Sequence, residues 1–188
     1  MGEEIIRLAT LNDVVPFHEL IKKSFQSIKD LGITWPSTRA DQTMIAENIQ
    51  YNAAYVLEKD GKLISTITIR FPWEGEEPIS QYPFVWWFGT DPAYANKGYG
   101  NRLLTYVEEV ILRGTLKAPA VTLGTSARKH PWLLEMYKRK GYYPCRYQES
   151  EDGDLSALLC KILIPELFNE KVLGYSLEQP VFIAGGQV

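Results

Sequence analysis

Residues 90–104, TDPAYANKGYGNRLL, decide how the rest of the sequence is interpreted. They follow the apolar run 84–88 (FVWWF), which is typical of a strand, and lead through a turn with Gly98 and Gly100 into an amphipathic helix. A helix start leaves about four backbone N–H groups unpaired and carries partial positive charge. Glycines allow the backbone to approach a ligand closely. The stretch therefore predicts a cradle for a phosphate or pyrophosphate, with Lys97 as a neighbouring cation.

Two glycines at this spacing also fit an ordinary turn that caps a helix, so the cradle needs further support. The stretch is not a P-loop, because no GxxxxGK[ST] is present. It is not a dinucleotide-binding fingerprint either, because the third glycine is missing and the preceding strands are predicted to be antiparallel hairpins.

Hydrophobic periodicity on both sides of this stretch predicts alternating strands and helices. The expected strands are 5–8, 53–57, 63–69, 84–88, 121–123, 144–148 and 155–163, and the expected helices are 14–25, 39–50, 100–113 and 131–140. Residues 26–38 are expected to be a loop or a broken helix. Asp60-Gly61 marks a hairpin turn, and Gly114 is expected to stop the third helix. This order indicates one α/β domain with a mixed sheet.

Composition narrows the class of protein. Of the 188 residues, 45% are apolar and 23% charged, which is typical of a globular chain with a sizeable core. A net charge of −3 argues against a nucleic-acid partner. No apolar run reaches the roughly 20 residues that span a membrane. The acidic start and the two cysteines predict a cytoplasmic protein without a disulfide framework. With two histidines and no CxxC or HExxH, no metal site is expected.

Two motifs in the correct order support a specific family. Residues 95–100 (ANKGYG) resemble the [Q/R]xxGxG/A signature of the GNAT acetyltransferases, and residues 134–142 (LEMYKRKGY) resemble that family's LYEKLGF helix end, with Tyr137 and Gly141 in register. The predicted order of elements is similar to the family over residues 5–163.

The resemblance implies a single-domain α/β fold. Residues 1–164 would form a mixed, mostly antiparallel sheet of six to seven strands, flanked by about four helices, with the fourth and fifth strands splayed apart. Residues 165–188 would be a C-terminal extension of unknown role, whose apolar end could add a strand, cover a partner or pack on the domain itself. The protein is expected to be a monomer or a homodimer.

By similarity, the cofactor is acetyl-CoA. Its pyrophosphate would bind the amides of the glycine-rich loop, and its pantetheine arm would run beside the fourth strand. The implied cofactor-binding residues are Phe88, Gly89, Thr90, Ala95, Asn96, Lys97, Gly98, Tyr99, Gly100 and Asn101. Ala95 departs from the usual Arg or Gln, so one side-chain contact is absent. Gly89 could ease a bulge or the splay, or could simply permit close packing.

The implied reaction is acyl transfer to an amine that must first lose a proton. Tyr137 matches the family's general acid, because a phenol of pKa near 10 stays protonated at neutral pH; packing against Leu133 is the structural alternative. The general base is left open between Glu74, Glu76 and Glu77, with Asp30 as a weaker candidate. The two cysteines, Cys145 and Cys160, are expected to be small buried hydrophobes without a nucleophilic role.

The acceptor is expected to be a primary amine of a small molecule, and the expected substrate-binding residues are Trp35, Trp73, Glu74 and Trp86. Strand alternation implies that at most one of Trp86 and Trp87 faces the acceptor. A protein or peptide amine is the second hypothesis. A non-catalytic acyl-CoA-binding module is the third.

Overall fold

The computed structural model describes residues 2–74 and 77–185. The strands are β1 Glu4–Leu8, β2 Ala53–Lys59, β3 Lys62–Arg70, β4 Phe84–Thr90, β5 Ala120–Ser126, β6 Tyr143–Glu149, β7 Leu155–Ile162 and β8 Val181–Ile183. The α-helices are α1 Val14–Ser24, α2 Gln26–Asp30, α3 Gln42–Tyr51, α4 Tyr99–Tyr106, α5 Pro131–Arg139 and α6 Glu170–Leu173. Through residue 163 the elements follow the predicted order, with the short helix α2 inside residues 26–38, where a loop or a broken helix is expected.

All eight strands form one sheet in the order β1-β2-β3-β4-β5-β7-β6-β8. Neighbouring strands are antiparallel except for the pairs β4–β5 and β6–β8. The expectation of six to seven strands is one too low, because the C-terminal extension adds β8 beside β6, with Tyr147 opposite Phe182. The rings of these two residues stack with centroids 4.8 Å apart.

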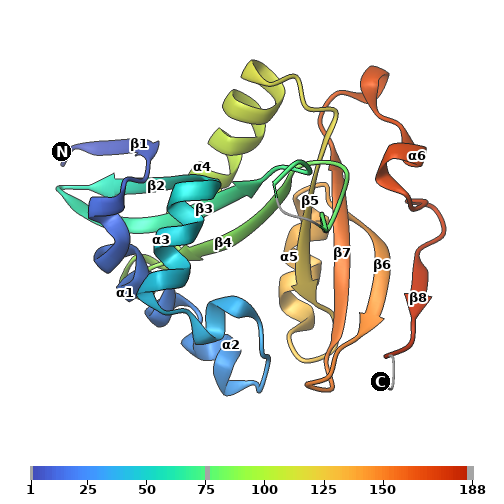
Figure 1. The fold of residues 1–188 in the computed structure, drawn as a ribbon, viewed down its shortest axis with the longest axis horizontal. Helices are drawn as coiled ribbons and strands as arrows, with labels where there is room; N and C mark the ends of the chain where they lie inside the picture. The colour runs from blue at the N-terminus through green and yellow to red at the C-terminus, as the bar shows by residue number, and fades with distance from the viewer. Residues whose placement is uncertain (1, 75–76, 186–188) are drawn as a thin grey trace.

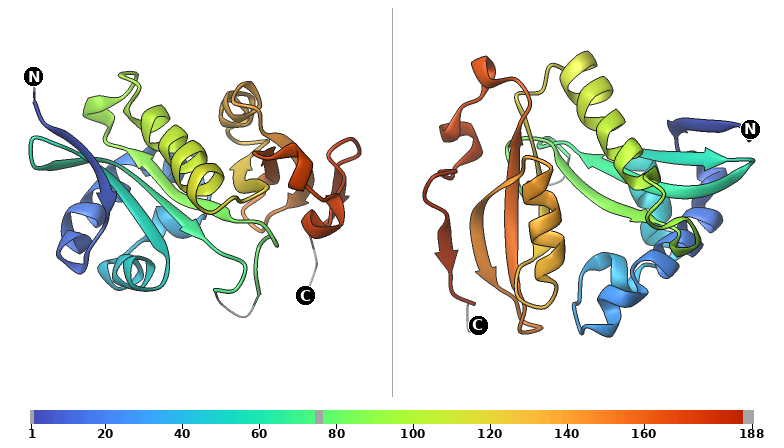
Figure 2. Two further views of the ribbon diagram at one scale, coloured as in Figure 1. Left: turned by 90° about the horizontal axis from the view of Figure 1, so that it is seen from above. Right: turned by 180° about the vertical axis from the view of Figure 1, so that it is seen from behind.

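Helices cover both faces of the sheet (Figures 1 and 2). On one face α1 and α3 pack on β2 to β4 around a buried cluster that includes Phe17, Ile45 and Trp87. On the other face α4 and α5 pack around a larger cluster that includes Leu104 and Tyr142. Each helix buries the apolar stripe that the sequence periodicity predicts. None of the helices in the described part of the chain is long and apolar enough to cross a membrane.

A third buried cluster shows what the C-terminal extension does. Tyr82 stacks on Phe168 with ring centroids 5.8 Å apart, and its hydroxyl accepts a hydrogen bond from the Asn169 amide at 3.0 Å. Leu173 is buried in the same cluster, against the strands of the C-terminal half. The extension therefore packs on the domain instead of extending away from it.

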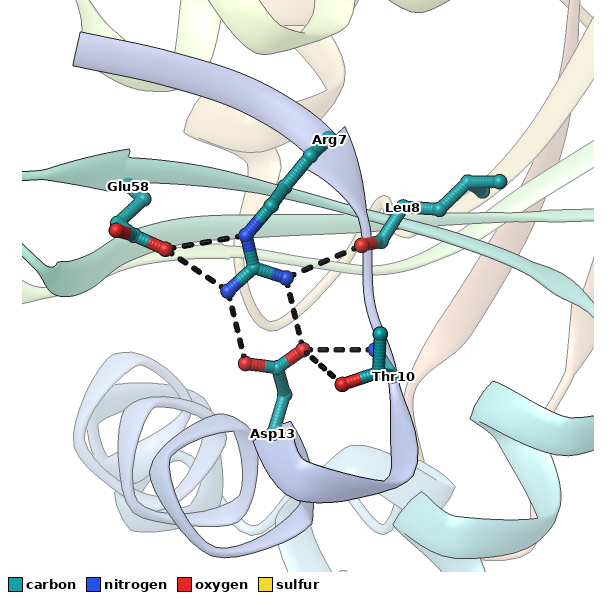
Figure 3. A network of polar contacts seen from close by, with 5 residues as sticks. All are labelled: Arg7, Leu8, Thr10, Asp13 and Glu58. Carbon is teal, nitrogen blue, oxygen red and sulfur yellow. Dashed lines mark hydrogen bonds and ion pairs between the residues drawn. The ribbon is translucent and has the colours of Figure 1, made fainter.

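An ionic network holds β1 to the start of α1 (Figure 3). The Arg7 guanidinium donates to both carboxylate oxygens of Asp13, at 2.8 and 2.9 Å, and to Glu58 on β2. The Thr10 amide donates to Asp13 at 2.7 Å. The Arg7 guanidinium and these hydrogen bonds lower the pKa of Asp13, although burial opposes them.

The expected helix stop at Gly114 is wrong. A π-helix, Val107–Thr115, continues α4 through this residue. A Cβ at Gly114 would lie 2.9 Å from the Glu109 carbonyl oxygen, so the glycine permits the wide turn of the π-helix. The hairpin turn, by contrast, agrees with the sequence, because Asp60 and Gly61 both have positive φ, at 51° and 75°.

Candidate active site

The parallel strands β4 and β5 part after two pairs, Phe84 with Thr122 and Val85 with Leu123. Beyond that point β5 continues to pair with β7 as far as Ser126, whereas β4 from residue 86 onwards has no ladder partner on the β5 side. The expected splay of the fourth and fifth strands is confirmed (Figure 1). It leaves backbone hydrogen-bonding groups of β4 available to an extended ligand.

A β-bulge lies inside the splay. Thr66 of β3 pairs with Gly89 and Thr68 pairs with Trp86, so Trp87 and Phe88 together oppose a single residue. Trp87 has φ 48°, a conformation that a bulky residue rarely adopts, and its carbonyl accepts a hydrogen bond from the Thr66 hydroxyl at 2.9 Å. Backbone strain of this kind gathers at ligand-binding sites.

The bulge overturns the strand-alternation argument for the two tryptophans. The rings of Trp86 and Trp87 lie 5.8 Å apart, and both pack against the cluster beneath α1 and α3. The extra residue in β4 breaks the alternation, so the two side chains share one face. Gly89 is not the bulge residue. A Cβ there would collide with Ser24 and would lie 3.1 Å from the Phe25 ring, so Gly89 permits close packing of α1.

On the α4 side, the glycine-rich loop has the geometry of an anion cradle. Asn96 and Gly98 adopt positive φ of 59° and 82°, and Gly98 is the residue that precedes α4. The first intrahelical hydrogen bond there runs from the Arg102 amide to the Gly98 carbonyl, at 2.9 Å. Within the described residues, the backbone amides of 96–101 donate to no backbone carbonyl. A Cβ at Gly98 would meet nothing within 4 Å, so the loop is open there.

Cations surround this loop. The Lys97 ammonium lies 5.3 Å from the centroid of the Tyr94 ring, and its side chain is free to reach solvent. The Lys140 ammonium, from the end of α5, contacts the Asn101 side chain. Lys140 was not among the residues expected from the sequence, because 39 positions separate it from Asn101. Ala95 contributes only backbone, and Gly100 permits close approach of α4 to Thr90.

Tyr137 lies on α5 and is 9% exposed. It belongs to the buried cluster that contains Val85 and Leu123, the last paired residues before the splay. Its ring meets Tyr142 edge-on, with centroids 5.7 Å apart, and its hydroxyl makes no hydrogen bond within 2–74 and 77–185. Burial, and then the charge of Glu108, raise the pKa of Tyr137 well above 10. The phenol therefore holds its proton at neutral pH.

A partly buried ion pair, Glu108–Lys161, contacts Tyr142, the residue whose ring packs edge-on against Tyr137. Glu108 is 4% exposed; it accepts hydrogen bonds from the Tyr142 hydroxyl at 2.6 Å and from the Lys161 ammonium at 2.5 Å. Sequence reasoning missed this group, because Glu108-Glu109 in an amphipathic helix normally indicates a solvent-exposed face. Helical spacing could have found it, because Glu108 lies four residues after Leu104 and four before Leu112, and both of these leucines are buried.

The expected acceptor residues are distributed unevenly. Trp86 lies at the start of the splay, and Trp35 meets Phe25 edge-on with ring centroids 6.5 Å apart. Trp73 is 76% exposed and stacks on Phe71. The Glu74 carboxylate accepts a hydrogen bond from the Phe71 amide at 3.0 Å, so it stabilises the turn of residues 71–74.

Two other candidates for the general base lie at the surface. Glu77 is exposed, and Asp30 accepts a hydrogen bond from Gln26 on the surface of α2. Glu76 lies outside the described residues.

Both cysteines are free and buried, and burial raises the pKa of Cys145 to about 11 and that of Cys160 to about 12. Such thiols are poor nucleophiles at neutral pH, as expected from the sequence.

The loop after α2 meets the β6–β7 turn and joins the two halves of the molecule. The Thr34 amide and hydroxyl both donate to Asp152. The Lys129 ammonium donates to the carbonyls of Gly32 at 3.0 Å and of Asp152 at 2.5 Å. These contacts connect the segment after α2 to the β5–α5 and β6–β7 loops, across the two parts of the sheet that the splay separates.

Comparison with known proteins agrees with this geometry. The sequence model of the Acetyltransferase (GNAT) family matches residues 16–142. The chain is 58% identical to S-alkylcysteine N-acetyltransferase of Bacillus subtilis (strain 168), over 93% of this chain and 97% of that protein. It is 44% identical to S-(2-succino)cysteine N-acetyltransferase of the same organism, over 86% of this chain and 97% of that protein.

A solved structure shows the same fold. PaiA N-acetyltransferase of Thermoplasma acidophilum, solved in complex with coenzyme A, superimposes with a TM-score of 0.63 at 14% identity, over 85% of this chain and 99% of that chain. The chain therefore belongs to the GNAT acetyltransferase family. It is an N-acetyltransferase, as the identity to the two relatives shows, which confirms the enzyme hypothesis over that of a non-catalytic binding module.

Proposed function

We propose that this enzyme transfers the acetyl group of acetyl-CoA to the α-amine of an S-alkylcysteine. The observation that carries the proposal is the splay after Val85 and Leu123, with the free amides of 96–101 on one side and Trp86 on the other. The relative at 58% identity acts on S-alkylcysteine, and this similarity supports the acceptor class.

The donor would bind through backbone groups. The amides of 96–101 receive the pyrophosphate, because an open helix start with two positive-φ residues concentrates N–H donors on an anion. Lys97 and Lys140 add positive charge, which offsets the side chain missing at Ala95. The unpaired edge of β4 at 88–90 accepts the amide-bearing pantetheine arm as a strand-like partner.

Acetyl-CoA supplies an acyl group already activated as a thioester. A β4 amide within the bulge donates a hydrogen bond to the carbonyl oxygen as negative charge develops on it. The acceptor ammonium first loses one proton to solvent, and the neutral nitrogen then forms the bond to the carbonyl carbon. As the carbon–sulfur bond breaks, Tyr137 gives its hydroxyl proton to the departing sulfur, and the raised pKa of Tyr137 keeps that proton available. The nitrogen loses its second proton to solvent, which in turn reprotonates the Tyr137 phenolate.

The acceptor side suits a small molecule better than a peptide. The Thr34–Asp152 and Lys129–Gly32 contacts bridge this side, where an extended peptide would need an open groove. Trp86 and Trp35 supply apolar surface for an S-alkyl group, with the buried Trp87 packed beside Trp86.

The test is an acceptor screen with acetyl-CoA. S-methylcysteine, S-ethylcysteine, S-(2-succino)cysteine, cysteine and a lysine-containing peptide are each incubated with enzyme, thiol release is followed, and the N-acetyl product is identified by mass spectrometry. We expect the S-alkylcysteines to have the highest kcat/KM. Preference for the peptide, or no product with any cysteine derivative, would refute the proposal.

A further inference from the structure

Arg70, the last residue of β3, carries its positive charge at the start of the splay. It pairs with Phe84, and its guanidinium carbon lies 5.5 Å from the centroid of the Trp86 ring. Trp86 is the first residue of β4 beyond the last β4–β5 pair. Arg70 therefore lies beside the first β4 residue of the splay, where the proposed function puts the acceptor.

The guanidinium of Arg70 has unused hydrogen-bonding capacity. Its Nε and Nη2 atoms donate to the Glu74 carbonyl, each at 3.4 Å, and Nη2 also donates to the Glu77 carbonyl at 3.3 Å. These bonds are long, and no carboxylate of the described residues lies within 4.0 Å of the guanidinium. Arg7, by contrast, is paired with two carboxylates. A half-buried cation that pairs with no carboxylate of residues 2–74 and 77–185 is a ready partner for an anionic ligand.

We propose that Arg70 binds the α-carboxylate of the acceptor and so makes the enzyme selective for amino acids over simple amines; this inference rests on the proposed function. In an α-amino acid the carboxylate and the amine share one carbon, so holding the carboxylate at Arg70 aims the amine at the splay. The fork of the guanidinium matches the two oxygens of a carboxylate. The cation–π contact with the Trp86 ring helps to position the guanidinium.

Two other arginines offer matched comparisons. Arg39 lines a cavity of about 360 Å³ together with Lys22 and Lys29 of α1 and α2. Arg146 on β6 donates to the Tyr175 hydroxyl at 3.1 Å. Neither has a carboxylate within 4.0 Å in 2–74 and 77–185, so each is an alternative site for the substrate carboxylate.

The experiment compares amino acids with their decarboxylated counterparts. Initial rates are measured for S-methylcysteine against 2-(methylthio)ethylamine, and for methionine and phenylalanine against their amines, with wild type, Arg70→Gln, Arg70→Lys, Arg39→Gln and Arg146→Gln. We expect Arg70→Gln to lower kcat/KM for the amino acids by about 10- to 150-fold, the scale of a lost charged hydrogen bond, chiefly through KM. Rates with the simple amines should change less than about twofold.

The Lys variant should lose less, because it keeps the charge but not the fork. Calorimetry with coenzyme A checks that each variant remains folded and binds the donor. The proposal is overturned if wild type does not prefer amino acids over amines, if Arg70→Gln impairs both classes equally, or if Arg39→Gln or Arg146→Gln gives the selective loss. If wild type prefers other amino acids to S-alkylcysteines, the proposed function fails but the role of Arg70 stands.

Discussion

Thr34 and Asp152, 118 positions apart in the sequence, are joined by two hydrogen bonds to one carboxylate oxygen. The Thr34 amide donates to Oδ2 of Asp152 at 2.8 Å and the Thr34 hydroxyl at 3.1 Å. Oδ1 of the same carboxylate accepts the Asp154 amide at 2.9 Å, which shapes the β6–β7 turn. One side chain therefore organises its own turn and holds the loop after α2 across the splay.

Breaking this link should loosen the acceptor side while leaving the donor side intact. Thr34→Ala removes the hydroxyl donor and keeps the amide donor, so a double-mutant cycle with Asp152→Ala reports the hydroxyl–carboxylate bond alone. Its coupling energy should be about 0.5–1.5 kcal/mol, since the pair is solvent-exposed. Each single variant should raise the KM for the amine several-fold and leave coenzyme A binding unchanged. Additive effects in the cycle would show that the two residues act independently.

Tyr137→Phe should lower kcat by roughly 10²–10⁴-fold, because the departing sulfur loses its proton donor. Coenzyme A binding by calorimetry should be retained. Burial raises the pKa of Tyr137, so the acid form persists at higher pH than for a free tyrosine. The wild-type kcat should accordingly show no fall from tyrosine ionisation between pH 7 and about pH 10. Unchanged turnover in the variant would remove Tyr137 from the mechanism.

Removing Glu108 alone should be costly to stability. Glu108→Leu leaves the half-buried Lys161 ammonium and the buried Tyr142 hydroxyl without their shared acceptor, and an unpaired buried polar group costs about 1–3 kcal/mol. The double variant Glu108→Leu/Lys161→Met removes both charges and should recover part of that loss, because the Tyr142 hydroxyl stays without its acceptor. Urea unfolding gives the free energy of unfolding of the single and the double variant. Equal stability of the single and double variants would show that the unpaired charge is not the cause.

Gly89→Ala should destabilise the fold by about 1–3 kcal/mol through overpacking, because the added methyl group collides with Ser24 of α1. Adding Ser24→Ala removes the Oγ atom and should restore part of the stability. Thermal unfolding of the single and double variants checks this. A Gly89→Ala protein as stable as wild type would mean that α1 can shift without cost.

The Arg7–Asp13 pair predicts a pH dependence of stability (Figure 3). The pKa of Asp13 is lowered in the folded state, chiefly by the Arg7 guanidinium, so folding favours the ionised carboxylate. Its contribution is complete above about pH 5 and is lost as pH falls through the folded pKa, below the usual 3.8. Asp13→Asn should therefore be less stable than wild type at pH 7, and the gap should narrow in acid. A gap independent of pH would contradict this assignment.

Local patterns account for what could be predicted. The positive φ of Asp60 and Gly61 follows from an Asp-Gly pair between two β-rich runs, and the free amides at 96–101 follow from a glycine-rich start of a helix. The π-helix shows where such reasoning ends. Judged from its neighbours in the sequence, Gly114 predicts the end of a helix. In the structure it lies inside the π-helix, where a Cβ would collide with the Glu109 carbonyl oxygen.

By itself, the sequence determined the order of elements to residue 163, the glycine-rich loop before α4 and the tyrosine on α5, because those features depend on neighbours a few positions apart. Only the tertiary structure decided the bulge that places Trp86 and Trp87 on one face, the pairing of Glu108 with Lys161, the packing of the C-terminal extension and the position of Arg70 beside the splay. Each of these is set by contacts between distant segments, and a strand pattern cannot reveal where an extra residue shifts its register.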